Sequence, residues 1–176
     1  MPTISAMPVD PQTLRIVHYP EPVLRRKAKP VEAVTGEVRA VAARMIELMH
    51  EAQGVGLAAP QVGLAWRLFV ANVTGEPGDD RIYINPVLRE PSRATEPHDE
   101  GCLSIPHVTA EVTRPLAITI DALDEQGKPF TLTAEGLPAR VWQHETDHLD
   151  GVLILDRMTP ADRIANKRAI RELERA

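Results

Sequence analysis

The sequence has a single cysteine, Cys102, and therefore cannot form an internal disulfide. The thiol must be a small buried side chain, a reactive group or a metal ligand. The sequence also lacks an apolar run near the ~18 residues of a membrane span. Residues 1–10 lack the basic and apolar regions of a signal peptide. We therefore expect a cytoplasmic protein with no membrane partner.

Basic residues do not outnumber acidic ones. The chain has 20 Lys and Arg against 25 Asp and Glu, a net charge of -5. This is the wrong sign for a protein coated in nucleic acid, so we expect no DNA partner. With 176 residues, of which 43% are hydrophobic, the chain is long enough for one core. We expect a single domain over residues 1–176.

The first third of the chain combines a proline-rich arm with an amphipathic helix. Six prolines lie in residues 1–35, which predicts an irregular N-terminal arm with at most a short strand near Ile16 and Val17. Apolar residues then recur at helical spacing over residues 38–52. Thr35 is a suitable N-cap for this helix.

The middle of the chain has the pattern of β-strands. β-branched or alternating segments lie at 67–73, 81–88, 109–114, 116–123 and 129–134, and turn residues separate them at 75–78, 91–97 and 127. The composition becomes helical again over 137–149. Thr159-Pro160 predicts the start of a C-terminal helix over 159–176. Strands grouped between helices predict an α+β fold with mixed or antiparallel β layers.

The strongest chemical signal is a pair of histidines with helical spacing. His144 and His148 are four residues apart, so on a helix both imidazoles leave the same face and can share one metal ion. Glu145 lies about 100° further round the helix. It is poorly placed to ligate the metal but suited to act as a general base. The same spacing also arises by chance among surface and core histidines.

A catalytic zinc-type site needs a third protein ligand. The metzincin pattern would place a histidine at position 154, which is Ile154. The gluzincin pattern, that of a metalloendopeptidase, would use Glu172 or Glu174, but both lie in a charged run typical of a solvated face. Cys102 would complete a Cys-His-His site as a thiolate. A small buried side chain is the alternative role for this cysteine.

A glycine-rich segment precedes the predicted strands. Gly54 and Gly56 allow close approach of backbone or ligand, and the Gln61 amide could stabilise an oxyanion. The segment lacks the spacing of both phosphate-binding glycine loops, so it does not predict nucleotide binding. A helix C-cap is the common alternative for such glycines.

Together the three segments resemble the signature of the peptide deformylases. That signature is a GxGxAAxQ loop, an EGCLS strand and a QHExDHLxG helix, and the chain matches all three in this order. The resemblance implies metal ligation by Cys102, His144 and His148 in a metallohydrolase. It also implies an α+β fold with the HExxH helix inside the β layers. The implied ion is Fe(2+) in the cell, with Zn(2+), Ni(2+) or Co(2+) after purification.

The resemblance also implies an activity, which is removal of the N-formyl group from formyl-methionyl peptides. Glu145 would be the general base on a water acidified by the metal. The Gln61 side chain and the Leu103 backbone N–H would contact the oxyanion. With Gly56 these residues would form a site tight enough to admit only a formyl group. A catalytically dead binding module with a structural metal is disfavoured, because closed structural sites use four ligands.

Other residues receive simpler predictions. The apolar side chains nearest the motifs, and so the candidates for a methionine pocket, are Val55, Leu57, Leu137 and Val141. The four histidines outside the motifs are expected at the surface: His18, His50, His98 and His107. Trp142 is expected in the core. Many deformylases carry a basic residue after the EGCLS strand that contacts the substrate backbone. Residues 105–109 of this chain contain no Lys or Arg, so we do not expect that contact here.

The C-terminal segment has the opposite charge to the rest of the chain. Residues 157–176 hold six basic and three acidic residues, a local charge of +3. A solvated helix with Lys or Arg to Glu pairs explains this charge. Contact of the C-terminal helix with ribosomal RNA is the alternative.

Overall fold

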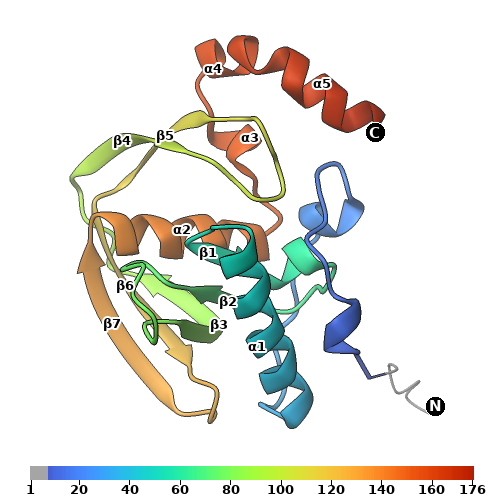
Figure 1. Cartoon of the computed structure of the whole chain (residues 1–176). Helices are drawn as coiled ribbons and strands as arrows, with labels where there is room; N and C mark the ends of the chain where they lie inside the picture. Colours follow the sequence, from blue (N-terminus) through green and yellow to red (C-terminus); the bar gives the residue numbers. More distant parts are fainter. Residues whose placement is uncertain (1–7) are drawn as a thin grey trace, which may run out of the picture.

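The computed structural model describes residues 8–176 (Figure 1). The strands are β1 (Gly56–Ala58), β2 (Leu68–Ala71), β3 (Arg81–Arg89), β4 (Thr95–Glu100), β5 (Ala110–Pro115), β6 (Ala117–Leu123) and β7 (Pro129–Glu135). The helices are α1 (Gly36–Glu51), α2 (Leu137–Leu149), α3 (Ile154–Arg157), α4 (Pro160–Ala165) and α5 (Lys167–Arg175). Short 3-10 helices are η1 (Pro11–Thr13), η2 (Pro22–Arg25) and η3 (Ala59–Val62). In this part of the chain no helix has the length and apolar character needed to cross a membrane.

The strands form two antiparallel sheets. The larger has the order β1-β2-β3-β6-β7, and the smaller pairs β4 with β5. In Figure 1 the β4–β5 pair lies on one side of α2 and the larger sheet on the other. The predicted α+β class with antiparallel layers is confirmed.

Helix α1 forms where the apolar periodicity predicts it. The Thr35 hydroxyl accepts a hydrogen bond from the Val38 N–H at 3.3 Å, as expected of an N-cap. The apolar face is buried at Val38, Val41, Ala42, Met45, Leu48 and Met49. This face packs on β1 and β2 and so supports the glycine-rich segment that follows the helix.

Helix α2 begins at Leu137 and ends at Leu149, as predicted. It contacts strands of both sheets, so it is held between the two β layers. Trp142 is 3% exposed, and its indole N–H donates to the Tyr83 hydroxyl at 3.0 Å. The predicted core role of this tryptophan is confirmed.

Two predictions about the elements are wrong. Residues 91–97 were expected as a turn, but β4 starts at Thr95 and forms an exposed, polar strand that pairs with β5. The C-terminal segment is not one helix, because α4 ends at Ala165 and α5 begins at Lys167, with Asn166 between them. The Asn166 amide donates to the carbonyl of Thr109 at 2.9 Å, and such side-chain bonds compete with helical ones.

The N-terminal arm is irregular, as predicted, between its short 3-10 helices. Residues 1–7 of the arm lie outside the described part of the chain. No strand forms at Ile16 and Val17; instead the Val17 N–H donates to the Gln61 carbonyl at 2.8 Å. Two residues later the Tyr19 N–H donates to the Ser104 carbonyl, also at 2.8 Å. The arm therefore connects the glycine-rich segment to the segment that carries Cys102.

Candidate metal centre

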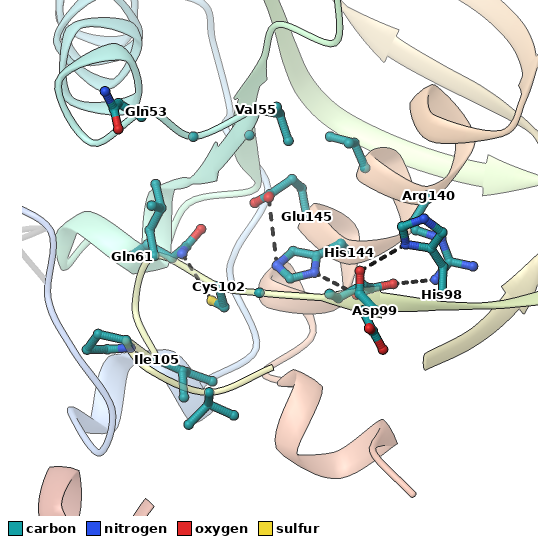
Figure 2. Close-up of a pocket in the computed structure, with 18 of the residues that line it drawn as sticks. Gln53, Val55, Gln61, His98, Asp99, Cys102, Ile105, Arg140, His144 and Glu145 are labelled. Carbon is teal, nitrogen blue, oxygen red and sulfur yellow. Dashed lines mark hydrogen bonds and ion pairs between the residues drawn. The ribbon is translucent and has the colours of Figure 1, made fainter. Parts of the chain in front are cut away.

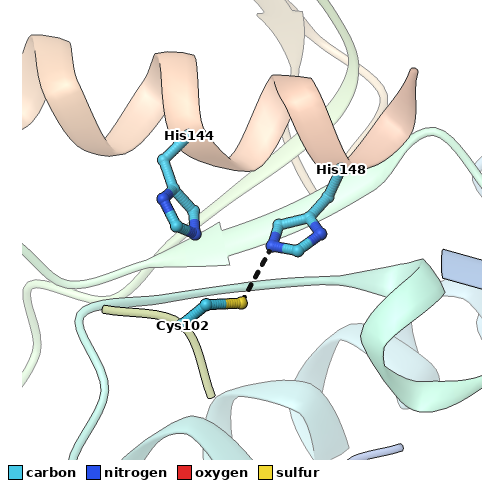
Figure 3. Close-up of side chains that lie close together, drawn as sticks. All are labelled: Cys102, His144 and His148. Atoms are coloured by element: carbon cyan, nitrogen blue, oxygen red, sulfur yellow. Dashed lines mark hydrogen bonds between the residues drawn. The ribbon is translucent and has the colours of Figure 1, made fainter. Parts of the chain in front are cut away.

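Three potential ligands converge between α2 and the end of β4. Donor atoms of Cys102, His144 and His148 all lie within 4.8 Å of one another. The Cys102 Sγ is 3.4 Å from the His148 Nε2, and the two imidazole centroids are 5.1 Å apart. Figure 3 shows both rings leaving the same face of the helix toward the thiol. The structure thus brings together the three residues that the sequence singled out.

His144 is oriented by a carboxylate that sequence reasoning missed. Its Nδ1 lies 2.9 Å from the Glu100 Oε1, which leaves Nε2 on the side of the other ligands. Glu100 in turn receives two hydrogen bonds from Arg114, at 2.7 and 2.9 Å, and one from Arg140 at 2.6 Å. Such carboxylate–histidine pairs fix the ring and its tautomer in metal sites. The signal in the sequence was an acidic residue two positions before Cys102.

The surroundings separate the pKa values of these groups. Burial alone would raise the pKa of Glu100, but hydrogen bonds from Arg114 and His144 outweigh it and lower that pKa. Burial lowers the pKa of His144, yet its hydrogen bonds with Cys102 and Glu100 raise it overall. Burial, together with the positive charges of His144 and Arg114, lowers the pKa of His148. A lowered pKa favours the neutral imidazole, which is the form that binds a metal.

Glu145 lies beside this cluster. Its Oε1 is 3.9 Å from the His144 Nε2, and its Oε2 is buried with no hydrogen-bond partner among the described residues. Burial raises the pKa of Glu145 to about 7. Gly56 faces this carboxylate so closely that a Cβ there would lie 2.7 Å from Oε1. A carboxyl group with this pKa and no fixed partner is suited to take and return a proton near neutral pH.

Gln61 presents its amide to the same space. Its side-chain oxygen accepts from the Ala58 N–H at 2.9 Å, which assigns the NH2 to the opposite side. That NH2 donates to the Ser104 hydroxyl at 3.1 Å and lies 3.5 Å from the Cys102 Sγ. Ser104 was not singled out from the sequence, although it stands in the same EGCLS segment as Leu103. Leu103 lines the cavity described next.

A cavity of about 430 Å³ opens onto Glu145, His144 and Cys102. Figure 2 shows Gln61, Cys102, His144 and Glu145 around it, with His98 and Arg140 to one side. The remaining lining is Gln53–Gly56, Asp99–Gly101, Leu103, Ile105–Val108, Leu137 and Val141. The lining is mostly apolar apart from these convergent polar groups, which is typical of small-molecule and peptide sites.

Three of the four apolar candidates line this cavity. Val55 and Leu137 lie at its mouth, 46% and 51% exposed, and Val141 lies deeper at 5%. Leu57 does not belong to it. This side chain is fully buried under α1, because strand β1 turns it to the opposite face from Gly56.

The four histidines outside the motifs are all exposed, as predicted. Two of them nevertheless line the cavity, His98 from β4 and His107 from the loop after Cys102. His107 has a left-handed backbone with φ of 67°. His98 and His107 are therefore exposed, as predicted, and at the same time line the cavity.

The donor set suits a divalent metal ion. A thiolate with two imidazoles satisfies zinc, and the same donors accept Fe(II), Co(II) and Ni(II). Glu172, the alternative third ligand, is not part of this donor group. It lies on α5, its side chain is 63% exposed, and it pairs with Arg168 at 3.2 Å. Within residues 8–176 only Cys102, His144 and His148 form such a group. A group of three protein donors beside Glu145 fits a catalytic site better than a structural one, which uses four.

Comparison with known proteins gives one consistent result. The family model described as polypeptide deformylase matches residues 13–164. The peptide deformylase 1B, chloroplastic/mitochondrial, of Arabidopsis thaliana is 45% identical over 148 residues, which cover 83% of this chain and 54% of the relative. A peptide deformylase of Chromohalobacter salexigens is 45% identical over 156 residues, covering 88% and 92%. The chain thus spans about half the length of the Arabidopsis relative.

The structural likeness extends over most of the chain. A crystal structure of peptide deformylase from Plasmodium falciparum superposes with a TM-score of 0.88 at 36% identity, covering 92% of this chain and 95% of that one.

Proposed function

The chain belongs to the polypeptide deformylase family, and we propose that it hydrolyses formyl-methionyl peptides to formate and a free N-terminus. The observation that carries this proposal is the cluster of Cys102, His144 and His148, which meets the cavity at Cys102 and His144, beside the buried Glu145. We further propose that residues 1–176 act as one metallohydrolase domain in the cytoplasm.

A divalent ion held by these three ligands would supply Lewis-acid chemistry, polarising the formyl carbonyl and acidifying a water. We propose Fe(II) as the ion in the cell, and Zn(II), Ni(II) or Co(II) in purified protein. An Fe(II) enzyme should lose activity in air through oxidation of the metal or the Cys102 thiolate. Equal activity after aerobic and anaerobic purification would point to zinc instead.

The chain's own residues would move the protons and hold the charge. Glu145 would take a proton from the attacking water and return it to the leaving nitrogen, for which its pKa of about 7 is suited. The Gln61 NH2 and the Leu103 backbone N–H would donate to the oxyanion; loss of one such donor costs ~3 kcal/mol in studied enzymes. Gly56 would leave room for Glu145 and for a carbonyl that carries only hydrogen.

The apolar side chains at the cavity would receive the methionine side chain. Three of them line the cavity: Val55, which directly precedes β1, and Leu137 and Val141, which lie on α2. Val55 and Leu137 are exposed in the structure without substrate. This supports a binding role for both, because large exposed apolar side chains often mark binding surfaces.

Substrate choice tests the proposal directly. We expect formate release from formyl-Met-Ala-Ser, little or none from its acetyl analogue, because the extra methyl would clash, and no cleavage of casein. The enzyme should be tested with Fe(II) under anaerobic conditions. If the protein cleaved casein at internal bonds and left formyl-Met-Ala-Ser intact, it would be an endopeptidase instead.

We also propose that the C-terminal helices contact ribosomal RNA. Lys167, Arg168 and Arg171 lie on α5, and all are exposed. Replacing these three by Gln should reduce binding to ribosomes and flatten its salt dependence. This triple variant is a sharper test than deleting the segment, since α5 also packs apolar residues on the core. Unchanged binding by the triple variant would reject the contact.

A further inference from the structure

A continuous series of ion pairs leads from the surface to His144. Arg157, at the end of α3, donates to both carboxylate oxygens of Asp147, at 2.5 and 2.8 Å. Asp147 also accepts from Arg114 at 2.9 Å. Arg114 donates twice to Glu100, which lies 2.9 Å from the His144 Nδ1. A hydrogen bond or ion pair joins each member to the next, so the series is not interrupted.

The exposure of the members falls steeply along this series. The side chain of Arg157 is 43% exposed and that of Asp147 is 15%, whereas Arg114 and Glu100 are 4% and 5% exposed. A buried guanidinium needs carboxylate partners, because an unpaired buried charge is costly. Arg114 has two such partners, and they lie on different elements: Asp147 on α2 and Glu100 on β4.

The two carboxylates compete for one guanidinium. The Asp147 Oδ2 is shared between Arg114 and Arg157. With Arg157 present, Asp147 is already neutralised by a bidentate partner. Arg114 can then turn its Nε and Nη2 toward Glu100 and contact Asp147 through Nη1 alone. Without Arg157, Asp147 would draw Arg114 toward itself and weaken its hold on Glu100.

We propose that Arg157 is a positioning residue for the metal ligand His144, acting through Asp147, Arg114 and Glu100. The inference rests on the proposed metal-dependent function and extends it to a side chain outside the cavity. It also assigns a role to Asp147, the residue immediately before His148, whose side chain is directed into this series of ion pairs.

The test compares the release of zinc from the full-length, zinc-loaded chain to a chromogenic chelator. We expect Arg157→Met to release zinc about threefold to tenfold faster, below the 10- to 100-fold typical of a direct partner of a ligand. Arg157→Lys restores a charge beside Asp147 and should return the rate at least halfway to that of the wild type. A purely structural role for the Arg157 side chain would not predict this rescue.

Arg25→Met is the matched control. Arg25 pairs with Asp156, and the exposure of that pair, 42% and 39%, is close to that of Arg157. Among the described residues no hydrogen bond or ion pair joins this pair to the side chain of Asp147, so the control should release zinc at the wild-type rate with a similar melting temperature. Equal rates for Arg157→Met and Arg25→Met, or no rescue by Lys, would overturn the inference. Absence of formate release by the wild type would instead reject the proposed function.

Discussion

Glu145 is the residue on which the proposed chemistry depends most. Its carboxylate lies close to His144 but is not in the donor group of Cys102, His144 and His148, so we expect Glu145→Gln to keep the metal. Turnover should fall roughly 10²- to 10⁴-fold, the usual contribution of a positioned general base. Metal content by elemental analysis and formate release would therefore change independently. Glu125→Gln, in the β6–β7 turn, is the control. Loss of metal from Glu145→Gln would show that the carboxylate is a ligand.

The pH dependence of the reaction follows from the same carboxyl group. Burial raises the pKa of Glu145 to about 7, so the protonated form, which cannot accept a proton, dominates at lower pH. Activity should therefore rise with pH, with a midpoint at or below pH 7, because a bound cation would favour the carboxylate. A profile of kcat/KM against pH, measured with the metal content constant, checks this. A rate that falls as pH rises from 5 to 7 would contradict the assignment.

Gly56 is predicted to be intolerant of even one added methyl. A Cβ at this position would lie 2.7 Å from the Glu145 Oε1 and 3.0 Å from its Cδ, so the carboxylate must move. A misplacement of about 1 Å can cost about 10²-fold in rate. We expect Gly56→Ala to lose turnover on this scale while it retains metal. Gly36→Ala, whose nearest atom is the Arg39 Nη2 at 3.8 Å, should behave as the wild type.

Among the elements, the N-terminal arm is expected to influence the site, although no motif in its sequence indicates this. Val17 donates its backbone N–H to the Gln61 carbonyl, and proline would remove that donor. We expect Val17→Pro to lower kcat/KM by about tenfold, the equivalent of one hydrogen bond of ~1.4 kcal/mol, with metal content unchanged. Val17→Ala keeps the N–H and is the control. If both variants have the same kcat/KM, the backbone bond does not position Gln61.

The two long helices and most strands could be predicted because their patterns are local. The apolar spacing of residues 38–52 and the cap at Thr35 specify α1 without reference to the rest of the chain. Strand β4 was missed because its polar residues, 95–100, show no alternation and include Pro97; pairing with β5 determines their structure. The break at Asn166 depends on a carbonyl more than fifty residues away, which no local pattern contains.

The residues of the site also fall into two groups, those that a local sequence pattern predicts and those that depend on packing. His144, Glu145 and His148 could be predicted from helical spacing, and Cys102 from a resemblance. The contacts of Glu100 and Ser104 could not, since they join α2 and the glycine-rich segment to the end of β4. Their presence in the same short motif as Cys102 was the available signal, but their partners depend on the packing of the two sheets.

At the scale of the whole molecule, metal binding should be visible as stability. A ligand that binds only the folded chain adds about 2.7 kcal/mol at 100 times its Kd. Added zinc should therefore raise the melting temperature of the wild-type protein. Cys102→Ala should lose most of this rise, because two imidazoles alone form a weak site. An equal rise in both proteins would exclude Cys102 as a ligand.

The distance along the chain between Cys102 and His148 has a further consequence. These ligands are 46 positions apart, the segment between them includes β5, β6, β7 and most of α2, and folding brings the Sγ and Nε2 to 3.4 Å. Closing a loop of this length in an unfolded chain costs about 4 kcal/mol by the chain-entropy relation. The fold thus acts like the rigid backbone of a synthetic chelator: folding brings the donors together, and an ion that binds them would in turn stabilise the folded chain.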